Sequence, residues 1–87
     1  MEYTQGTVVS SLKGHDKDKL FVIIKSENAY VSLVDGKNRR KHNPKRKNVK
    51  HIASSQYHIP EVESLSDKSI RKQLNRLKIS EKDNLRR

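Results

Sequence analysis

The pattern of apolar and polar residues predicts two strands joined by a polar turn early in the chain. Gly6–Leu12 shows the two-residue repeat of a strand, and Lys19–Lys25 is expected as the next strand. Between them, residues 13–19 are polar and include Gly14, which reaches positive φ without steric cost. The run Leu20–Ile24 is continuously apolar and rich in branched residues, as in a strand covered on both faces. The core is therefore expected to form around this run.

Three more strands are expected to follow. Ala29–Val34 alternates again after a short polar turn. The pair Asp35-Gly36 predicts a tight hairpin, because a two-residue turn of this kind needs positive φ. Lys37–Lys41 is then expected to return as an exposed edge strand, and Lys47–Ala53 to bring the chain back to the core. Five short strands separated by turns are typical of a small closed barrel.

The C-terminal part predicts one helix after a linker. The expected organisation is a barrel over residues 1–53, a linker over 54–65, a basic helix over 66–79 and a frayed polar tail over 80–87. Ser66 is the expected helix N-cap. The apolar positions of the helix repeat at helical spacing: Ile70, Leu74 and Leu77. This narrow stripe either docks on the barrel or lies on RNA or a partner protein, and we favour the second arrangement.

Composition places the chain among small basic domains. Its 87 residues, 31% of them hydrophobic, allow one domain with a modest core. The 20 Lys and Arg residues outnumber the 10 Asp and Glu residues, and the formal net charge is +10. Eight of these cations fall within residues 36–52, which contain no acid. A block of this kind attracts a polyanion and speeds its encounter.

The sequence also bears on the cellular compartment in which the protein is expected. With no cysteine, the chain forms no disulfide and offers no thiolate to a metal. No apolar run approaches the length of a membrane span, and the first residues lack the pattern of a signal peptide. We therefore expect a soluble protein of the cytoplasm.

The first two expected strands resemble a KOW motif, the strand–turn–strand signature of small SH3-like barrels in ribosomal proteins and NusG-type transcription factors. The residues that carry the resemblance are Gly6, Val8, Val9, Ser11, Leu12, Gly14, Asp16, Leu20, Phe21 and Val22. The segments Val34–Arg40 and Pro44–Ile52 extend it to most of residues 3–53. Over this range the chain is similar to short bacterial KOW-domain RNA-binding proteins, which are related to large-subunit ribosomal proteins of archaea and eukaryotes.

The resemblance implies a mainly β fold, a small SH3-like five-stranded barrel of the KOW type, to which the chain adds a C-terminal basic amphipathic helix. It also implies large-subunit ribosomal RNA as the partner, with neighbouring ribosomal proteins as further partners. The basic block independently implies a polyanion. We therefore expect non-catalytic binding of structured RNA by an accessory ribosomal or ribosome-associated protein that serves translation.

The residues expected to bind RNA are those whose charges neutralise phosphates, together with nearby histidines. The basic block supplies Lys37, Arg39, Arg40, Lys41, His42, Lys45, Arg46, Lys47, Lys50 and His51. The turn before the second strand supplies Lys13, His15 and Lys17, and the helix supplies Arg71, Lys72 and Arg76. The alternatives are a solvated charged surface for the block and a plain turn for residues 13–19.

Aromatic residues are too few for extensive base stacking. The chain has three Tyr, one Phe and no Trp, whereas proteins that read single strands usually stack several bases on aromatic rings. Contacts with the backbone and shape of structured RNA are therefore expected to dominate. Tyr30 either stacks one base or packs on the barrel.

Metal binding and catalysis are not expected. Four histidines lack the short paired spacing of a zinc site: His15, His42, His51 and His58. No set of nucleophile, base and orienting residue can be assembled, and no Gly-rich phosphate loop is present. We expect no metal, no other cofactor and no small-molecule substrate.

Three other functions stay open. A transcription-associated KOW module would bind RNA polymerase or nucleic acid, although these residues show no companion domain of the NusG type. A peptide-binding SH3-type module usually needs an aromatic groove, which so few aromatic residues do not favour. Binding to a membrane surface would need apolar anchors beside the basic block, and none is present. Composition alone does not distinguish RNA from DNA.

Overall fold

The computed structural model describes residues 3–14 and 17–85, and for residues 78–85 it describes only the backbone. Five strands, two short 3-10 helices and one α-helix make up this part of the chain. The strands are β1 (Thr7–Ser11), β2 (Leu20–Glu27), β3 (Tyr30–Val34), β4 (Lys45–Asn48) and β5 (Ile52–His58). The helices are η2 (Val49–His51), η3 (Val62–Ser64) and α1 (Asp67–Leu85).

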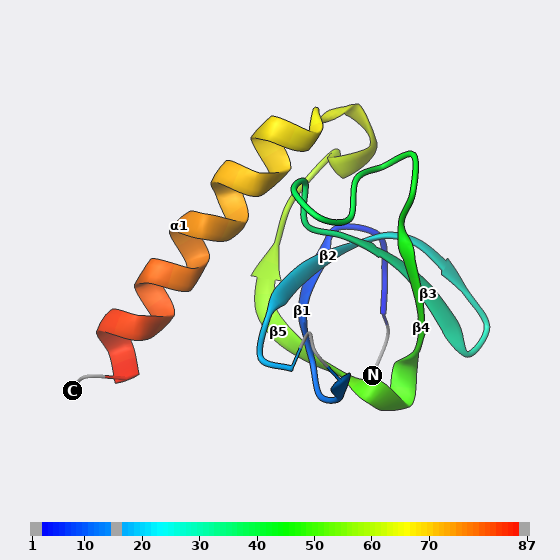
Figure 1. The fold of residues 1–87 in the computed structure, drawn as a ribbon, viewed down its shortest axis with the longest axis horizontal. Coiled ribbons are helices and arrows are strands. Elements are labelled where there is room, and N and C mark those ends of the chain that lie inside the picture. The colour runs from blue at the N-terminus through cyan, green and yellow to red at the C-terminus, as the bar shows by residue number, and fades with distance from the viewer. Residues whose placement is uncertain (1–2, 15–16, 86–87) are drawn as a thin grey trace.

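The strands form one antiparallel sheet in the order β4-β3-β2-β1-β5. Consecutive strands β4 and β5 therefore lie at the two ends of this order, and only the short η2 joins them. A connection this short requires the sheet to curl until its ends approach, which is the rolled form seen in Figure 1. The predicted mainly β fold with five strands is confirmed, and the arrangement is consistent with a small SH3-like barrel.

One of the two apolar clusters lies between the inward faces of the strands. Its buried members are Val9, Phe21, Ile23, Val31, Leu33 and Ile52, with Tyr3 and Val49 packed against them. Successive side chains of a strand point to opposite faces, so β2 and β3 each give this cluster two alternate residues. The prediction that Val31 and Leu33 lie on the same face of β3 is confirmed.

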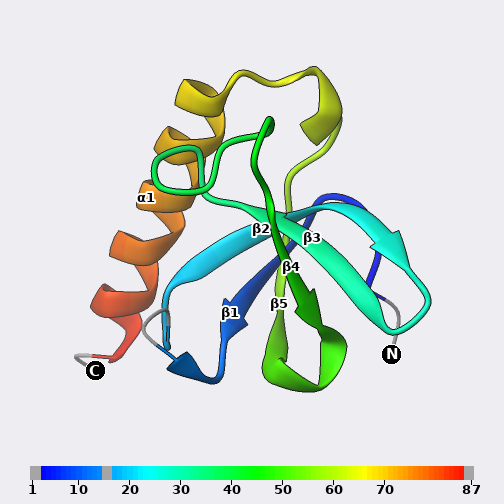
Figure 2. The same ribbon diagram turned by 45° about the vertical axis from the view of Figure 1, so that its right-hand side comes forward.

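The second cluster lies on the other face of the sheet, under α1. Its buried members are Val8, Val22, Val34, Ile59, Val62, Ile70 and Leu74. Figure 2 shows α1 running beside the sheet. Both faces of β2 are therefore covered, which explains why Leu20–Ile24 is apolar without alternation.

Helix α1 packs on the barrel, and our preference for a partner surface is wrong. Ile70 is fully buried and Leu74 is 5% exposed. Ser66 is the N-cap, as predicted, because its Oγ accepts a hydrogen bond from the backbone N–H of Ser69 at 3.2 Å. Burial against the sheet, and not propensity alone, stabilises the first turns of this helix.

The length and character of α1 differ from the prediction. The helix ends at Leu85 and not at residue 79, so most of the expected tail is helical in its backbone, while residues 86–87 lie outside the described part of the chain. It carries six Lys or Arg residues and three Asp or Glu residues. Over its whole length the helix is not clearly basic or amphipathic.

The hairpin predicted at Asp35-Gly36, and the edge strand predicted at 37–41, are wrong. Asp35 Oδ1 instead accepts hydrogen bonds from the backbone N–H groups of Lys37 and Arg39, both at 2.8 Å. The Asp35 N–H donates to the Arg39 carbonyl oxygen at 2.9 Å. These bonds close a tight loop, and the fourth strand begins only at Lys45. Residues 36–44 thus form a loop beside the start of α1 (Figure 2).

The segment expected as a linker is largely structured. Strand β5 continues to His58, where it pairs with Thr7 of β1. Ile59 and Val62 are then buried under α1. Residues 53–58 are mostly polar or small, so no apolar repeat indicates this strand. It forms because its backbone pairs with β1.

Two glycines with nearly the same φ angle provide a test of whether α1 packs against the loop at Gly36. Gly14 has φ +80° and Gly36 has φ +77°. A Cβ at Gly14 would meet no atom within 4 Å, whereas one at Gly36 would overlap the carbonyl oxygen of Asp67 and lie 2.8 Å from Arg71 N. Gly14→Ala should therefore cost about 1–2 kcal/mol of unfolding free energy through left-handed strain alone. Gly36→Ala should cost that and at least about 1 kcal/mol more through overpacking.

Denaturant unfolding followed by circular dichroism measures both variants. Equal losses would mean that α1 does not rest on Gly36.

Candidate nucleic-acid interface

The basic block runs from the loop 36–44 along β4 to η2, so its two ends lie at opposite ends of that strand. The loop 36–44 lies beside the start of α1, and β4 then carries the chain away from it to η2, as Figures 1 and 2 both show. A strand of four residues spans roughly 13 Å. The Asn43 N–H donates to the Arg40 carbonyl oxygen at 2.9 Å, so the chain does turn before β4. That the two segments form one patch stays a prediction, and the cations are grouped by the end of β4 at which they lie.

The first group, here called the loop–helix group, consists of Lys37, Arg39, Arg40 and Arg71. The side chains of Lys37 and Arg40 are exposed, and those of Arg39 and Arg71 are half-buried. The hydrogen bonds from Asp35 hold the loop in place, and Arg71 lies directly against Gly36. Residues about thirty positions apart in the sequence thus meet on one surface.

A hollow of about 190 Å³ lies within this surface. Its lining includes Lys19 before β2, Lys37 and Asn38 from the loop, and Arg71 and Asn75 from α1. Asp35 also lines it, and its carboxylate, one oxygen of which accepts two backbone hydrogen bonds, offsets part of this positive charge. Three cations and two amide side chains around one hollow are the groups that phosphate oxygens bind.

Lys41 belongs to the fold more than to the surface. Its Nζ donates to the carbonyl oxygens of Glu63 at 2.6 Å and Leu65 at 2.8 Å. Its backbone N–H donates to Asp67 Oδ1 at 2.9 Å. Lys41 therefore fastens the loop to the start of α1, and this counts against it as a phosphate ligand. The neighbouring His42 is exposed.

Strand β4 sends its cations to opposite faces. Lys45 pairs with Leu33 and Lys47 with Val31, both interior residues, whereas Arg46 pairs with the outward-facing Ser32. Lys47 Nζ donates to Ser11 Oγ at 2.5 Å and to the Lys13 carbonyl oxygen at 3.2 Å. Of these three cations, Arg46 is the one that the structure exposes.

The second group, here called the turn group, consists of Lys13, Lys50 and His51. The Leu12 N–H donates to the His51 carbonyl oxygen at 2.9 Å, which joins the end of β1 to η2. Asn48 caps η2 by accepting a hydrogen bond from the Lys50 N–H at 2.9 Å. Lys13 and Lys50 are exposed and His51 is half-buried. Two segments that the sequence predicted separately as binding residues thus lie together.

The remaining predicted residues lie elsewhere. Lys17 is exposed on the turn between β1 and β2, and His15 lies outside the described residues. Lys72 and Arg76 are exposed on α1. Neither belongs to the loop–helix group, although Arg71, one position before Lys72, does.

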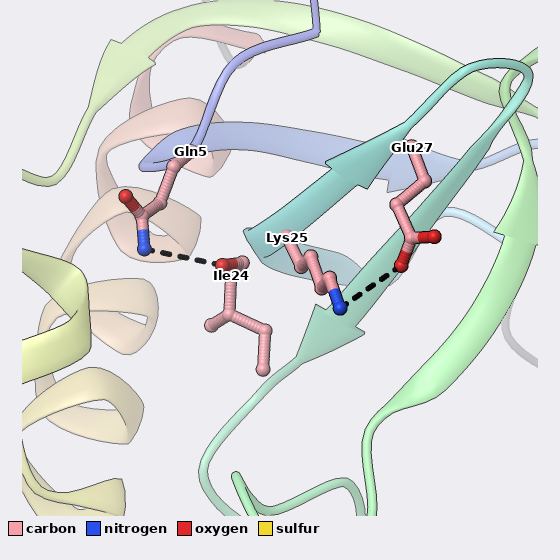
Figure 3. A network of polar contacts seen from close by, with 4 residues as sticks. All are labelled: Gln5, Ile24, Lys25 and Glu27. Atoms are coloured by element: carbon pink, nitrogen blue, oxygen red, sulfur yellow. Dashed lines mark hydrogen bonds and ion pairs between the residues drawn. The ribbon is translucent and has the colours of Figure 1, made fainter.

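The outer face of β2, β3 and β4 contains residues that the sequence did not indicate. Lys25 and Glu27 form an ion pair at 3.1 Å (Figure 3). They lie on the same face as Tyr30, which is 39% exposed. The alternation of β3 indicates that Tyr30 and Ser32 share a face, but the register that brings in Lys25 and Glu27 cannot be known from the sequence.

In the described part of the chain, no three His, Cys, Asp or Glu side chains gather closely enough to hold a metal ion. No helix within the described residues is both long and apolar enough to cross a membrane. The chain matches no known protein-family model and no curated protein.

Proposed function

We propose that this protein binds structured RNA without catalysis, through contacts with phosphates. The observation that supports this most strongly is the hollow beside α1, where Lys19, Lys37 and Arg71 converge from three separate segments. Lys37 and Arg71 come from segments far apart in the sequence, and a pair of cations placed side by side attracts the phosphates of a polyanion. Two flanking amides, from Asn38 and Asn75, add hydrogen-bond donors.

The turn group extends this surface to a second point of contact. Lys13 and Lys50 are exposed, and within the described residues neither side chain is seen in an ion pair. The length of β4 separates them from the loop–helix group. Two cationic groups at such a separation fit phosphates spaced along a folded RNA better than they fit one compact anion. The geometry therefore favours a macromolecular polyanion.

Large-subunit ribosomal RNA is the first candidate, and the protein would act in the cytoplasm as an accessory ribosomal or ribosome-associated factor. This part of the proposal rests on the resemblance to the KOW motif. The strand–turn–strand form expected of that motif corresponds to β1, the turn with Gly14 at positive φ, and β2. The alternative is a transcription-associated KOW module, and the experiment must distinguish it from a ribosomal or ribosome-associated protein.

The dependence of binding on salt tests the proposal. Each phosphate contact contributes about 0.7–0.9 to the slope of log affinity against log salt. About four contacts, from the exposed cations of the two groups, should therefore give a slope of about −3 to −4 for purified large-subunit ribosomal RNA. Filter binding between 50 and 200 mM salt measures it, at roughly the range in which this effect is large.

Sedimentation of cell extract at low salt supplies the control for the partner. The protein should travel with the large ribosomal subunit and leave it after ribonuclease treatment. Association with RNA polymerase that survives nuclease would instead support the transcription-associated alternative. A salt slope near zero would contradict phosphate binding altogether.

A further inference from the structure

The outer face of β2, β3 and β4 presents two rows of paired side chains. One row consists of Lys25, Ser32 and Arg46, and the other of Glu27, Tyr30 and Asn48. The neighbours of Tyr30 and Ser32 along β3 point to the interior cluster, so both rows face outward. Lys25 and Glu27 are exposed, at 66% and 60% of their side-chain surface. None of these six residues belongs to the cluster under α1, which covers the same face farther along, at Val22 and Val34.

Tyr30 and Arg46 form a preassembled pair on this face. Arg46 Cζ lies 4.2 Å from the centroid of the Tyr30 ring, a distance at which a guanidinium and an aromatic face attract. Each side chain thereby restricts the rotamers of the other. The pair presents a flat, polarisable surface whose ordering cost is already met before any ligand arrives.

The chemistry around this pair suits a base better than a phosphate. The carboxylate of Glu27 lies opposite Tyr30 in the register, and it repels phosphate oxygens. The same carboxylate accepts hydrogen bonds from exocyclic amino groups of bases. Figure 3 shows Glu27 paired with Lys25, whose ammonium group is a donor for a neighbouring phosphate. With a base stacked on the ring, its amino group could donate to the Glu27 carboxylate, and the adjoining phosphate could accept from the Lys25 ammonium group.

A large open hollow adjoins the same corner of the sheet. It has a volume of about 780 Å³, and its lining includes Tyr3, Gln5 and Lys25. Gln5 Nε2 donates to the Ile24 carbonyl oxygen at 3.1 Å, which holds the N-terminal segment against β2 (Figure 3). Lys25 belongs both to this hollow and to the outward rows. Tyr3 and Val49, which also line it, pack against the interior cluster, so the hollow opens at the edge of the barrel and Lys25 links it to the outward face.

We propose that one unpaired base of the bound RNA stacks on the Tyr30–Arg46 pair. This inference rests on the proposed RNA binding and adds a contact of a different kind. The loop–helix and turn groups bind phosphates, which carry no sequence or pairing information. The Tyr30–Arg46 pair selects RNA that offers a flipped or bulged nucleotide, because a base inside a helix cannot reach a protein ring.

Two RNA hairpins of equal length test the inference, one fully paired and one with a single bulged 2-aminopurine. The full chain should bind both, quench the fluorescence of the 2-aminopurine and bind the bulged hairpin more tightly. Tyr30→Ala should weaken binding of the bulged hairpin by about 5- to 150-fold, the loss of one base–aromatic stack. Its affinity for the paired hairpin should change little, since phosphate contacts remain.

Matched substitutions separate stacking from simple apolar contact. Tyr30→Phe keeps a flat ring and should keep both the quenching and the preference, whereas Tyr30→Leu keeps apolar volume and should lose them. Equal affinity of the unchanged chain for both hairpins, without quenching, would overturn the stacking inference while RNA binding stood. Binding to neither hairpin would instead overturn the proposed function. Loss of both hairpins by Tyr30→Ala with an unchanged circular dichroism spectrum would also overturn the inference.

Discussion

Reversal of Lys37, Arg40 and Lys50 to Glu is expected to weaken RNA binding by roughly 100-fold or more near physiological salt. All three side chains are exposed, and within the described residues none of them is seen in an ion pair. Each lost phosphate contact removes about 0.7–0.9 from the salt slope, so the triple variant should also lower that slope by about 2–3. Filter binding across a salt series measures the affinity and the slope together.

The control variant reverses three cations of α1: Lys68, Lys72 and Arg76. They are exposed and recur every fourth residue, so they form one stripe on the helix. Their reversal to Glu changes the net charge by the same amount as the first triple variant. This variant should weaken binding less. If both variants lose the same affinity, net charge alone explains binding and the two cationic groups are not a site. Lys41 and Lys47 stay unchanged in both variants, because their ammonium groups bind oxygens within the fold.

Ile70→Ala is expected to lower the free energy of unfolding by about 2–5 kcal/mol. Ile70 is fully buried and belongs to the cluster that contains Val8, Val22 and Val34 from three strands. Removal of its side chain leaves a cavity between the sheet and α1, which cannot collapse without moving the helix. A loss of this size is a large share of the stability of a small domain. Urea unfolding monitored by circular dichroism gives the value.

Asn75→Ala is the matched control, because Asn75 is exposed on the same helix. Its effect should stay within about 0.5 kcal/mol. If Ile70→Ala were as mild as this control, α1 would be an accessory of an independently stable barrel. Truncation after Leu65 would then leave the β-sheet intact. We expect instead that the truncated chain unfolds, since the buried valines of the outer face would meet water.

The strands could be predicted from sequence wherever apolar residues mark them. Val8 and Val9 are adjacent and both fully buried, one in each cluster, and this doublet announces a strand with two covered faces. The run Leu20–Ile24 carries the same signal more strongly. Ser66 was predictable as a cap, because its role depends only on the residues that follow it.

The errors arose where distant contacts decide the structure. After Asp35, Gly36 indicates a hairpin turn. In the structure a glycine is needed there for another reason, because the backbone of α1 leaves no room for a Cβ. The residues of β4 are all polar, so no hydrophobic repeat indicates that strand. Its register with β3 determines that Arg46 faces outward while Lys47 reaches Ser11. Lys41 looks like any member of a charge run until the carbonyl oxygens of Glu63 and Leu65 are placed beside it.

The central strand has a consequence for how the molecule opens. Strand β2 has hydrogen-bonded neighbours on both edges, β1 and β3, and Phe21, Val22 and Ile23 are buried against both clusters. Fraying of the C-terminal turns of α1, beyond the buried Leu74, leaves the cover over β2 and both of its ladders in place. Amide protons at its middle therefore exchange with water only when the whole sheet separates, so that their exchange rate reports global unfolding. The C-terminal turns of the helix thus differ in local stability from the barrel, whereas the turn that carries Ile70 opens together with the sheet.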